Sequence, residues 1–307
     1  VSPWSDGSVR KILSRLGPGV IGVAAFQINV LATYCIGFFV GGHVVASYGY
    51  AVRLLELPQG LFAVSMATFL LPALAGLAAE KKYGDFRTRI DEAARHLLFL
   101  NLPAAVLLFV MAEPIVQLLF QYGAFDEAAT QRTAWALRCL APALPGYSLV
   151  LILVRAFYAL GEVRTPVKIS IACLVLNLVL ALAMVFQFKD GLEQGAFGIA
   201  NTISSTLNAV LLWRALRRRE ELAPIALPGL RKQLPMMMGL AWMAGLVAWG
   251  VGLGYSDGIG KNVEVSARLL TVFGPLFSAG IFYWAMSGLA GVDSAKAILG
   301  IFRRKGS

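Results

Sequence analysis

Residues 44–78 read VVASYGYAVRLLELPQGLFAVSMATFLLPALAGLA, an apolar run that carries only two charged side chains, Arg53 and Glu56. A helix of about 20 apolar residues crosses a lipid bilayer, so this run is far longer than one crossing requires. Pro58 and Gly60 interrupt it. The stretch therefore predicts a bent or broken membrane-spanning helix, of the kind that often borders a substrate cavity. The alternative is a long tilted helix that the proline only kinks.

The rest of the chain has the same character. Of 307 residues 58% are hydrophobic and only 14% are charged, and the mean hydropathy is +0.71. Soluble domains carry about a quarter charged residues, so this composition excludes one. Apolar runs occur at residues 18–40, 44–78, 97–120, 135–160, 167–188, 196–216, 234–253 and 269–289. Because unsatisfied backbone groups cannot face lipid, these runs predict an all-α polytopic membrane protein with about eight transmembrane helices.

The basic residues are distributed unequally between the two sides of the predicted membrane. With the N-terminus in the cytoplasm, twenty of the 27 Lys and Arg residues fall inside and four fall outside, namely Arg132, Lys189, Lys261 and Arg268. This bias follows the positive-inside rule and predicts that both termini are cytoplasmic. The sequence RALRRR at 214–219 is then a topology anchor and a contact for anionic membrane lipids. The net charge of +10 therefore does not indicate a nucleic-acid partner.

Three further segments organise the chain. Residues 81–96 are polar with apolar residues at helical spacing, which predicts an amphipathic helix at the membrane surface or a solvated helical loop. Asp126 marks the start of a short helix in an external loop. The Pro-containing segment 220–233 predicts a cytoplasmic linker between a six-helix lobe, residues 1–219, and a terminal helix pair with a basic tail, residues 234–307.

The sequence offers no reaction chemistry. Cys35, Cys139 and Cys173 have unrelated spacings, and His43 and His96 form no ligand cluster, so neither a metal site nor a disulfide framework is predicted. No phosphate-binding glycine loop or nucleophile elbow occurs. We therefore expect no cofactor, no metal and no enzymatic activity.

Polar residues inside the apolar runs are the first candidates for function: Asn29, Asn177, Thr202 and Asn208. Such residues commonly form hydrogen bonds between helices, worth about 0.6–2 kcal/mol each. They are also typical of a polar cavity or an ion site, and Asn177 and Thr202 are the candidates for that role.

Arg53 and Glu56 are the second set. A charged side chain deep in a spanning helix costs about 2.5–3.5 kcal/mol, so it is normally paired or faces water. Arg53 and Glu56 share a helix face and can neutralise each other. Alternatively, Arg53 faces a hydrated cavity and binds an anionic group of a substrate, with Glu56 holding its guanidinium in place. The planar fork of arginine suits phosphate oxygens.

Four blocks of sequence resemble the MurJ (MviN) family of lipid II flippases. They read GPGVIGVAAFQIN at 17–29, AVRLLELPQGLFAVSMATFLLPALA at 51–75, EPIVQLLFQYGAFD at 113–126 and RAFYALGEVRTPVKI at 155–169. The blocks follow the family's order and spacing, and the last is the most specific.

The resemblance implies the multidrug/oligosaccharidyl-lipid/polysaccharide exporter fold, in which two six-helix lobes surround a central cavity and two further helices follow. In that layout the chain corresponds to the second lobe and the two C-terminal helices. Because it begins with Val1, we expect a fragment whose partner is the N-terminal lobe of the same protein.

The resemblance also implies site residues. Arg53 matches a cavity arginine on the family's eighth helix and Glu56 an acidic residue often found there, and we count Gln27 and Asn29 with these substrate-binding residues. The chain departs from its relatives at Val52, where many have Asp.

Relatives that bind sodium have carboxylates at two further positions. Thr33 and Ala181 occupy the matching positions in this chain, which argues against a sodium site here.

The implied function is transport of lipid II, the undecaprenyl-diphosphate-linked peptidoglycan precursor, across the bacterial inner membrane by alternating access. Two alternatives remain: an exporter of a drug or of another polyprenyl-linked glycan, and a membrane scaffold for cell-wall assembly that transports nothing.

Overall fold

The computed structural model describes residues 7–188, 192–222, 227–256 and 265–295, and within these ranges every regular element is a helix. The elements are α1 (Gly7–Val40), α2 (Gly42–Pro58), the π-helical segment η2 (Gln59–Val64), α3 (Ser65–Ala79), α4 (Tyr83–Val110), α5 (Ala112–Phe120), α6 (Glu127–Leu140), α7 (Ala143–Ala159), α8 (Arg164–Val185), α9 (Gln194–Arg217), the short 3₁₀ helix η3 (Glu220–Leu222), α10 (Pro228–Ser256) and α11 (Val265–Leu289).

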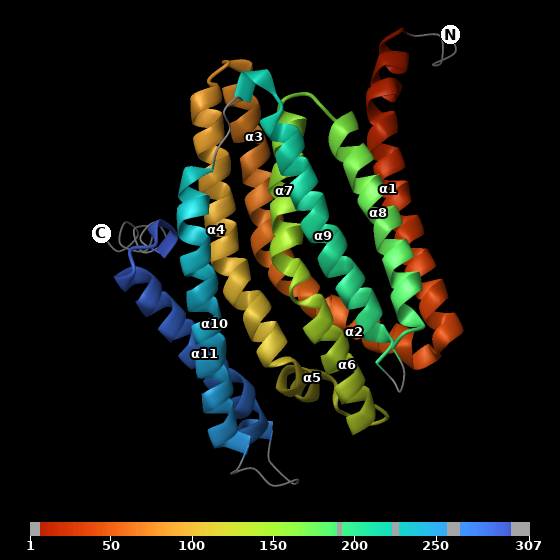
Figure 1. Cartoon of the computed structure of the whole chain (residues 1–307), viewed down its shortest axis with the longest axis vertical. Coiled ribbons are helices and arrows are strands. Elements are labelled where there is room, and N and C mark those ends of the chain that lie inside the picture. Colours follow the sequence, from red (N-terminus) through yellow and green to blue (C-terminus); the bar gives the residue numbers. More distant parts are fainter. Residues whose placement is uncertain (1–6, 189–191, 223–226, 257–264, 296–307) are drawn as a thin grey trace.

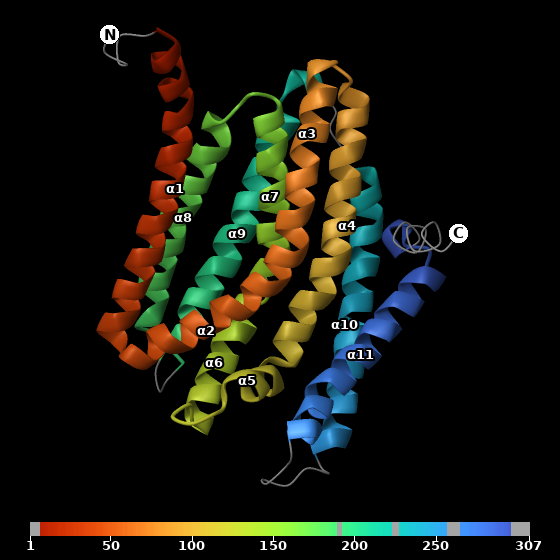
Figure 2. The same cartoon turned by 180° about the vertical axis from the view of Figure 1, so that it is seen from behind.

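The helices form a bundle with α1 and α8 at one edge and α10 and α11 at the other (Figure 1). The helices α7 and α9 lie on one face, and α2 and α3 pack behind them, as the opposite view shows (Figure 2). Six helical stretches among the described residues are long and apolar enough to cross a membrane, and the bent pair α6–α7 makes a seventh. With α1, these elements cover the eight predicted runs, and the predicted all-α polytopic class is confirmed.

Two predicted spans are wrong as single straight helices. The run 97–120 ends as a spanning helix at Val110, and α5 starts in a new direction after Met111. The run 135–160 is divided between α6 and α7, which meet at an angle of 45°. Pro142 lies at this second break and cannot donate a backbone hydrogen bond there.

The segment 81–96 does not form a separate helix at the membrane surface. From Tyr83 onward it is the first part of α4, and its apolar residues Phe86 and Ile90 are fully buried. The periodicity was a correct sign of a helix, but its apolar face packs against the bundle. Asp126 caps α6 as predicted, because its Oδ1 accepts a hydrogen bond of 2.7 Å from the backbone of Ala129.

Of the terminal helix pair, α10 makes the main contact with α4. The hydroxyl of Tyr283 on α11 donates to the carbonyl of Phe99 at 2.9 Å, and the two rings are 5.0 Å apart. The predicted linker 220–233 is shorter in the structure, since α10 already begins at Pro228. Lys189, Lys261 and the basic tail at 303–305 lie outside the described residues.

Small residues bring the central helices close together. A Cβ atom on Gly198 of α9 would lie 2.7 Å from the Cβ of Cys139 on α6. A Cβ atom on Gly146 of α7 would lie 2.8 Å from the hydroxyl of Ser205 on α9. Close backbone approach of this kind is how membrane helices gain packing energy without a hydrophobic driving force. The two glycines therefore hold α6, α7 and α9 as one core.

Candidate functional site

Arg53 lies on an exposed face of α2, and no described acid forms an ion pair with it. Its guanidinium carbon is 6.0 Å from the centre of the Tyr50 ring, within the range of a weak cation–π contact. Glu56, one turn further on, is also exposed, and the two charges do not pair with each other. The internal ion pair that the sequence left open is thus not formed in this structure.

The exposed face continues past these charges as an apolar surface. Leu57 and Leu61 are 68% and 61% exposed, and Phe69 on α3 is 80% exposed. A face that combines an unpaired arginine with large apolar side chains suits neither water alone nor lipid alone. Such a surface is expected where an amphipathic molecule or further helices pack against it.

A π-helical turn separates Arg53 on α2 from the part of this face that α3 forms. Buried residues in α2 and α3 recur every three or four positions, except between Pro58 and Ala63, where the step is five. The π-helical segment Gln59–Val64 accommodates the additional residue, so the buried stripe stays on the same side. Such π turns are frequent at functional sites. The predicted interruption at Pro58 and Gly60 is therefore a local change of helix type, and the chain stays helical throughout.

Behind α2, asparagine side chains join three helices. Asn29 on α1 donates to the carbonyl of Leu174 at 3.1 Å, and its Nδ2 is 3.5 Å from the Oδ1 of Asn177 on α8. Asn177 in turn donates to the hydroxyl of Ser204 on α9 at 3.2 Å. The structure thus brings Asn29 and Asn177 together inside the lobe, whereas Gln27 is exposed on α1.

A second polar group continues from this chain. Asn201 on α9 donates to the hydroxyl of Tyr48 on α2 at 2.7 Å and accepts from the hydroxyl of Tyr147 on α7 at 2.5 Å. Its own carbonyl accepts from Ser204 at 3.2 Å, which connects the two polar groups. Sequence reasoning missed Asn201, Tyr48 and Tyr147. The available sign was that Asn201, like Thr202 beside it, is a polar residue within an apolar run.

Thr202 lies apart from these residues. Its hydroxyl donates to the carbonyl of Cys139 at 3.0 Å, which places it between α9 and α6. Thr33 is buried and donates to the carbonyl of Asn29 at 2.9 Å, and Ala181 is buried. Within the described part of the chain no three His, Cys, Asp or Glu side chains are grouped so as to hold a metal ion. The polar chain is neutral, and its geometry fits a hydrogen-bonded link between helices.

A pocket of about 500 Å³ lies at the end of the bundle where α2, α5 and α6 meet, one turn before Arg53 on α2. The ring of Tyr50 lines it and lies 4.7 Å from Phe120 and 5.3 Å from Phe125. Polar side chains also line it, from His43, Ser47 and Arg132. Tyr50 therefore connects the cationic group of Arg53 with a pocket of mixed aromatic and polar character.

Comparison with known proteins gives one consistent result. A family model described as lipid II flippase MurJ matches residues 1–257. Over 225 residues the chain is 34% identical to the probable lipid II flippase MurJ of Haemophilus influenzae, a match that covers 71% of the chain and 43% of that relative. It is 29% identical over 242 residues to the lipid II flippase MurJ of Burkholderia cenocepacia, with 78% of the chain and 46% of the relative covered.

The fold is also similar to that of a solved structure, lipid II flippase MurJ in its inward closed conformation. The TM-score is 0.68 at 19% sequence identity, and the match covers 91% of the chain and 54% of the solved structure. The chain thus spans about half the length of the relatives that it matches.

Proposed function

Since the chain belongs to the MurJ family of lipid II flippases, we propose that it forms one lobe of a transporter that moves lipid II from the inner to the outer leaflet of the bacterial inner membrane. The transported molecule is unchanged, so the process is transport and not catalysis. The chain spans about half the length of its relatives, and a second lobe supplies the other wall of the path.

The observation that carries this proposal is the unpaired Arg53 on an exposed helix face. A guanidinium without a carboxylate partner is free to bind an anion, and the diphosphate of lipid II presents oxygens that match its two parallel N–H groups. From the sequence, we expected Glu56 to hold this guanidinium in place. In the structure Arg53 approaches Tyr50 instead, so Glu56 is left exposed near the path and can contact the polar headgroup.

The exposed apolar side chains that follow Arg53 suit the remainder of the substrate. Leu57, Leu61 and Phe69 continue the same helix toward the opposite end of the bundle. A diphosphate at Arg53 with an apolar tail along this face keeps each part of lipid II in matching surroundings. Alternating access then requires the face to close against the second lobe and reopen toward the other leaflet.

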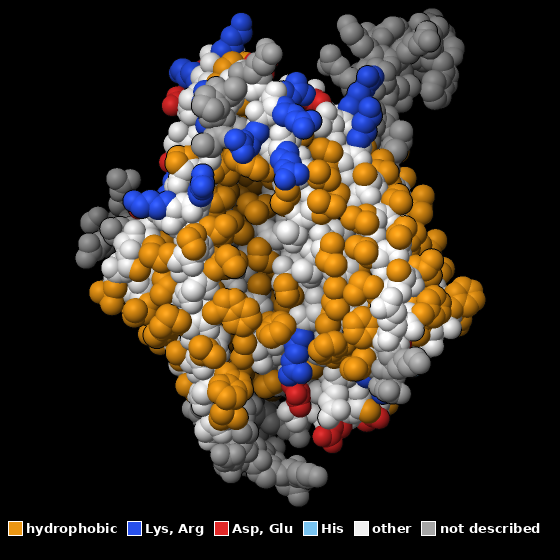
Figure 3. Space-filling view, viewed as in Figure 1, with side chains coloured by type: hydrophobic (Ala, Val, Ile, Leu, Met, Phe, Trp, Pro, Cys, Tyr) orange, Lys and Arg blue, Asp and Glu red, His pale blue; other side chains and the backbone are white. Residues whose placement is uncertain are grey.

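The distribution of basic residues supports one orientation of the bundle in the membrane. Lys and Arg side chains gather at the end of the bundle where α3 meets α4, α7 meets α8 and α9 ends (Figure 3). By the positive-inside rule this end faces the cytoplasm and, since α1 begins at the same end, the N-terminus does too. The pocket lined by Tyr50 and Arg132 then opens toward the outside, where the headgroup is released.

Complementation tests the proposal. In cells depleted of their own lipid II flippase, the full protein with Arg53→Ala should fail to restore growth while its amount in the membrane stays near normal. The control is Arg89→Ala, because Arg89 is an exposed arginine that pairs at 3.4 Å with Glu92 on the same helix. Growth of cells that carry Arg53→Ala at the rate of the control would refute a role of Arg53 in transport.

A further inference from the structure

A second pocket lies on the side of the bundle away from α2. It has a volume of about 790 Å³ and is bounded by α4, α7, α9 and the start of α10. The helices α7 and α9 are on the face opposite α2 and α3, as Figures 1 and 2 show together. None of the residues that line it comes from α1, α2 or α3. The pocket is therefore separate from the face that carries Arg53.

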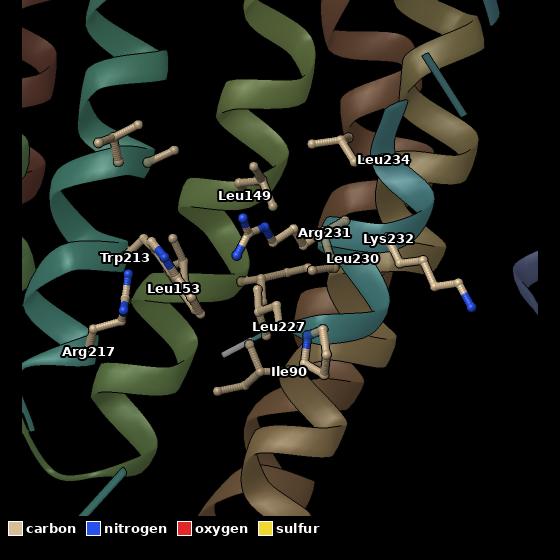
Figure 4. Close-up of a pocket in the computed structure, with 15 residues that line it drawn as sticks. Ile90, Leu149, Leu153, Trp213, Arg217, Leu227, Leu230, Arg231, Lys232 and Leu234 are labelled. Atoms are coloured by element: carbon tan, nitrogen blue, oxygen red, sulfur yellow. The ribbon is translucent and has the colours of Figure 1, made fainter. Parts of the chain in front are cut away.

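Most of its lining is apolar. Leu149 and Leu153 of α7 lie opposite Leu230 and Leu234 of α10 (Figure 4). Val210 of α9 also lines the pocket. In the space-filling view, apolar side chains surround this part of the face and Lys and Arg side chains lie above it (Figure 3). A hydrocarbon chain is the ligand that such walls would accept from the surrounding bilayer.

Two arginines and a tryptophan also line the pocket. Arg231 reaches from α10 across the opening, and Arg217 turns from the end of α9 toward Trp213 (Figure 4). Neither guanidinium forms an ion pair with any acid whose side chain the structure describes. Lys232, next to Arg231, points away from the opening (Figure 4). The pocket thus combines a cationic mouth with an apolar interior.

The start of α10 does not supply the anion site by itself. The backbone amide of Leu230 is already hydrogen-bonded to the Oδ1 of Asp91 at 3.0 Å, so an acid of α4 caps this helix. Attraction for an anion therefore comes from Arg217 and Arg231. Arg217 is the last residue of α9 and Arg231 lies in the first turn of α10, so both are near the basic end of the bundle, at the level where phosphate headgroups of the cytoplasmic leaflet would lie. Trp213 beside them suits that interface, where tryptophan is enriched.

We propose that this pocket binds one anionic phospholipid of the cytoplasmic leaflet, with its phosphate between Arg217 and Arg231 and an acyl chain along Leu149, Leu153 and Val210. Arginine binds phosphate oxygens through two parallel hydrogen bonds, and a low-dielectric surrounding strengthens them. A volume of this size accommodates the headgroup region of a lipid. The proposal requires only that the chain spans a membrane, and it is independent of which molecule the protein transports.

A phospholipid fits better than the polyprenyl diphosphate of a transported substrate. The opening lies on the opposite side of the bundle from the exposed face of α2, so a molecule bound here does not reach Arg53. A resident lipid would instead fill the space between α9 and α10, where the terminal helix pair joins the lobe.

Lipid titration of the full protein tests the site. Protein stripped of lipid in detergent is titrated with phosphatidylglycerol, phosphatidylcholine, undecaprenyl diphosphate and inorganic phosphate, and bound species are counted by native mass spectrometry. The variant Arg217→Ala/Arg231→Ala removes the two charges at the mouth. The matched control Arg214→Ala/Arg218→Ala removes two neighbouring exposed charges at the end of α9, neither of which lines the pocket. A third variant, Val210→Trp, keeps both arginines and fills the apolar part, and it is placed at an exposed position to spare the fold.

The expected result is that phosphatidylglycerol binds about 30-fold more weakly to Arg217→Ala/Arg231→Ala, as two arginine–phosphate contacts at the membrane surface imply. Its affinity for the control should change by less than about threefold, the effect of general surface charge. Val210→Trp should also bind phosphatidylglycerol more weakly than the unaltered protein does. Phosphatidylcholine should bind weakly to the unaltered protein and to every variant.

Four results would overturn the proposal. Equal losses in the two double variants would show attraction to a basic surface and no built site. Displacement of phosphatidylglycerol by undecaprenyl diphosphate at lower concentration would assign the pocket to the transported lipid. Full binding by Val210→Trp, or inorganic phosphate binding as tightly as the lipid, would show that the apolar walls take no part.

Discussion

Arg95 and Asp293 are 198 residues apart in the sequence, yet the Nη1 of Arg95 lies 2.8 Å from the Oδ2 of Asp293. Arg95 also contacts Asp91, one turn earlier on α4, at 3.0 Å. Asp91 caps the start of α10 and Asp293 follows α11. The guanidinium of Arg95 on α4 thus lies between the start of α10, which Asp91 caps, and the segment that follows α11.

Replacing Arg95 should loosen this attachment. Asp91 is nearly buried, and Arg95→Ala would leave its charge without a partner, which costs about 3 kcal/mol for a buried pair. Asp293→Ala should cost less than about 1 kcal/mol, because the Asp293 side chain is 59% exposed. The measurement is thermal unfolding in detergent, with the exposed Arg89→Ala as the control. If Arg95→Ala and Asp293→Ala lower the stability equally, the unpaired charge of Asp91 is not the cause of the loss in Arg95→Ala.

Gly198 should tolerate no side chain. A methyl group there would lie 2.7 Å from the Cβ and 2.8 Å from the carbonyl carbon of Cys139, so α6 and α9 would have to separate. We expect Gly198→Ala to destabilise the protein by about 1–3 kcal/mol, as overpacking does. Gly239→Ala is the matched control, since no atom lies within 4 Å of its added methyl group. Alanine favours a helix over glycine, so the control should be neutral or slightly more stable. A smaller loss at Gly198 than at Gly239 would mean that the two helices are not in close contact.

Asn201 should matter because it satisfies two tyrosines. Asn201→Leu removes the partner of Tyr48 and of Tyr147, and two hydrogen bonds of about 0.6–2 kcal/mol each are lost. If the hydroxyls left unpaired cause the loss, the triple variant with Tyr48→Phe and Tyr147→Phe should recover part of the stability. Unfolding of the single and triple variants in detergent measures this. A triple variant that is less stable than Asn201→Leu alone would show that the hydroxyls have other partners.

The sequence predicted the helical class and the position of the spans well, because spanning a membrane needs long apolar runs that a single sequence displays. The breaks at Met111 and Ala141 were missed, although Pro114 stands three residues after the first and Pro142 directly after the second, and both gave a local sign. The five-residue step from Pro58 to Ala63 was also visible as a spacing in the sequence, but it has meaning only once the buried side is known.

The candidate site was less predictable. Arg53 and Glu56 stand out because charges are rare in apolar runs, but whether they pair depends on side-chain directions that spacing does not determine. Asn201 joins partners that are 153 and 54 residues away, so its role depends on how the helices pack. The pocket for which we propose a lipid likewise depends on packing, because α9 and α10 bring Arg217 and Arg231 to the same pocket.

The π-helical segment yields the last prediction, on the proposed transport. Deleting Gly60 removes the one residue by which the step from Pro58 to Ala63 exceeds an α-helical turn. The buried residues of α2 and those of α3 then stay on the inner side of one ordinary α-helix. Gly60 itself is exposed, and no other side chain lies close to it, so the protein should fold and accumulate. What it loses is the weakened hydrogen bonding of the π turn, which would let the helix bend as access alternates.

We therefore expect the Gly60 deletion to reach the membrane in normal amounts but to complement a flippase-depleted strain poorly. Gly76→Ala is a suitable control, because Gly76 is also exposed with open space around it and lies in the regular α-helix of α3. Since the deletion leaves Arg53 and its Tyr50 contact in place, loss of transport would indicate a mechanical role of the bend and not a loss of substrate binding. Full complementation by the deletion variant would show that the π turn only fits one additional residue into the helix.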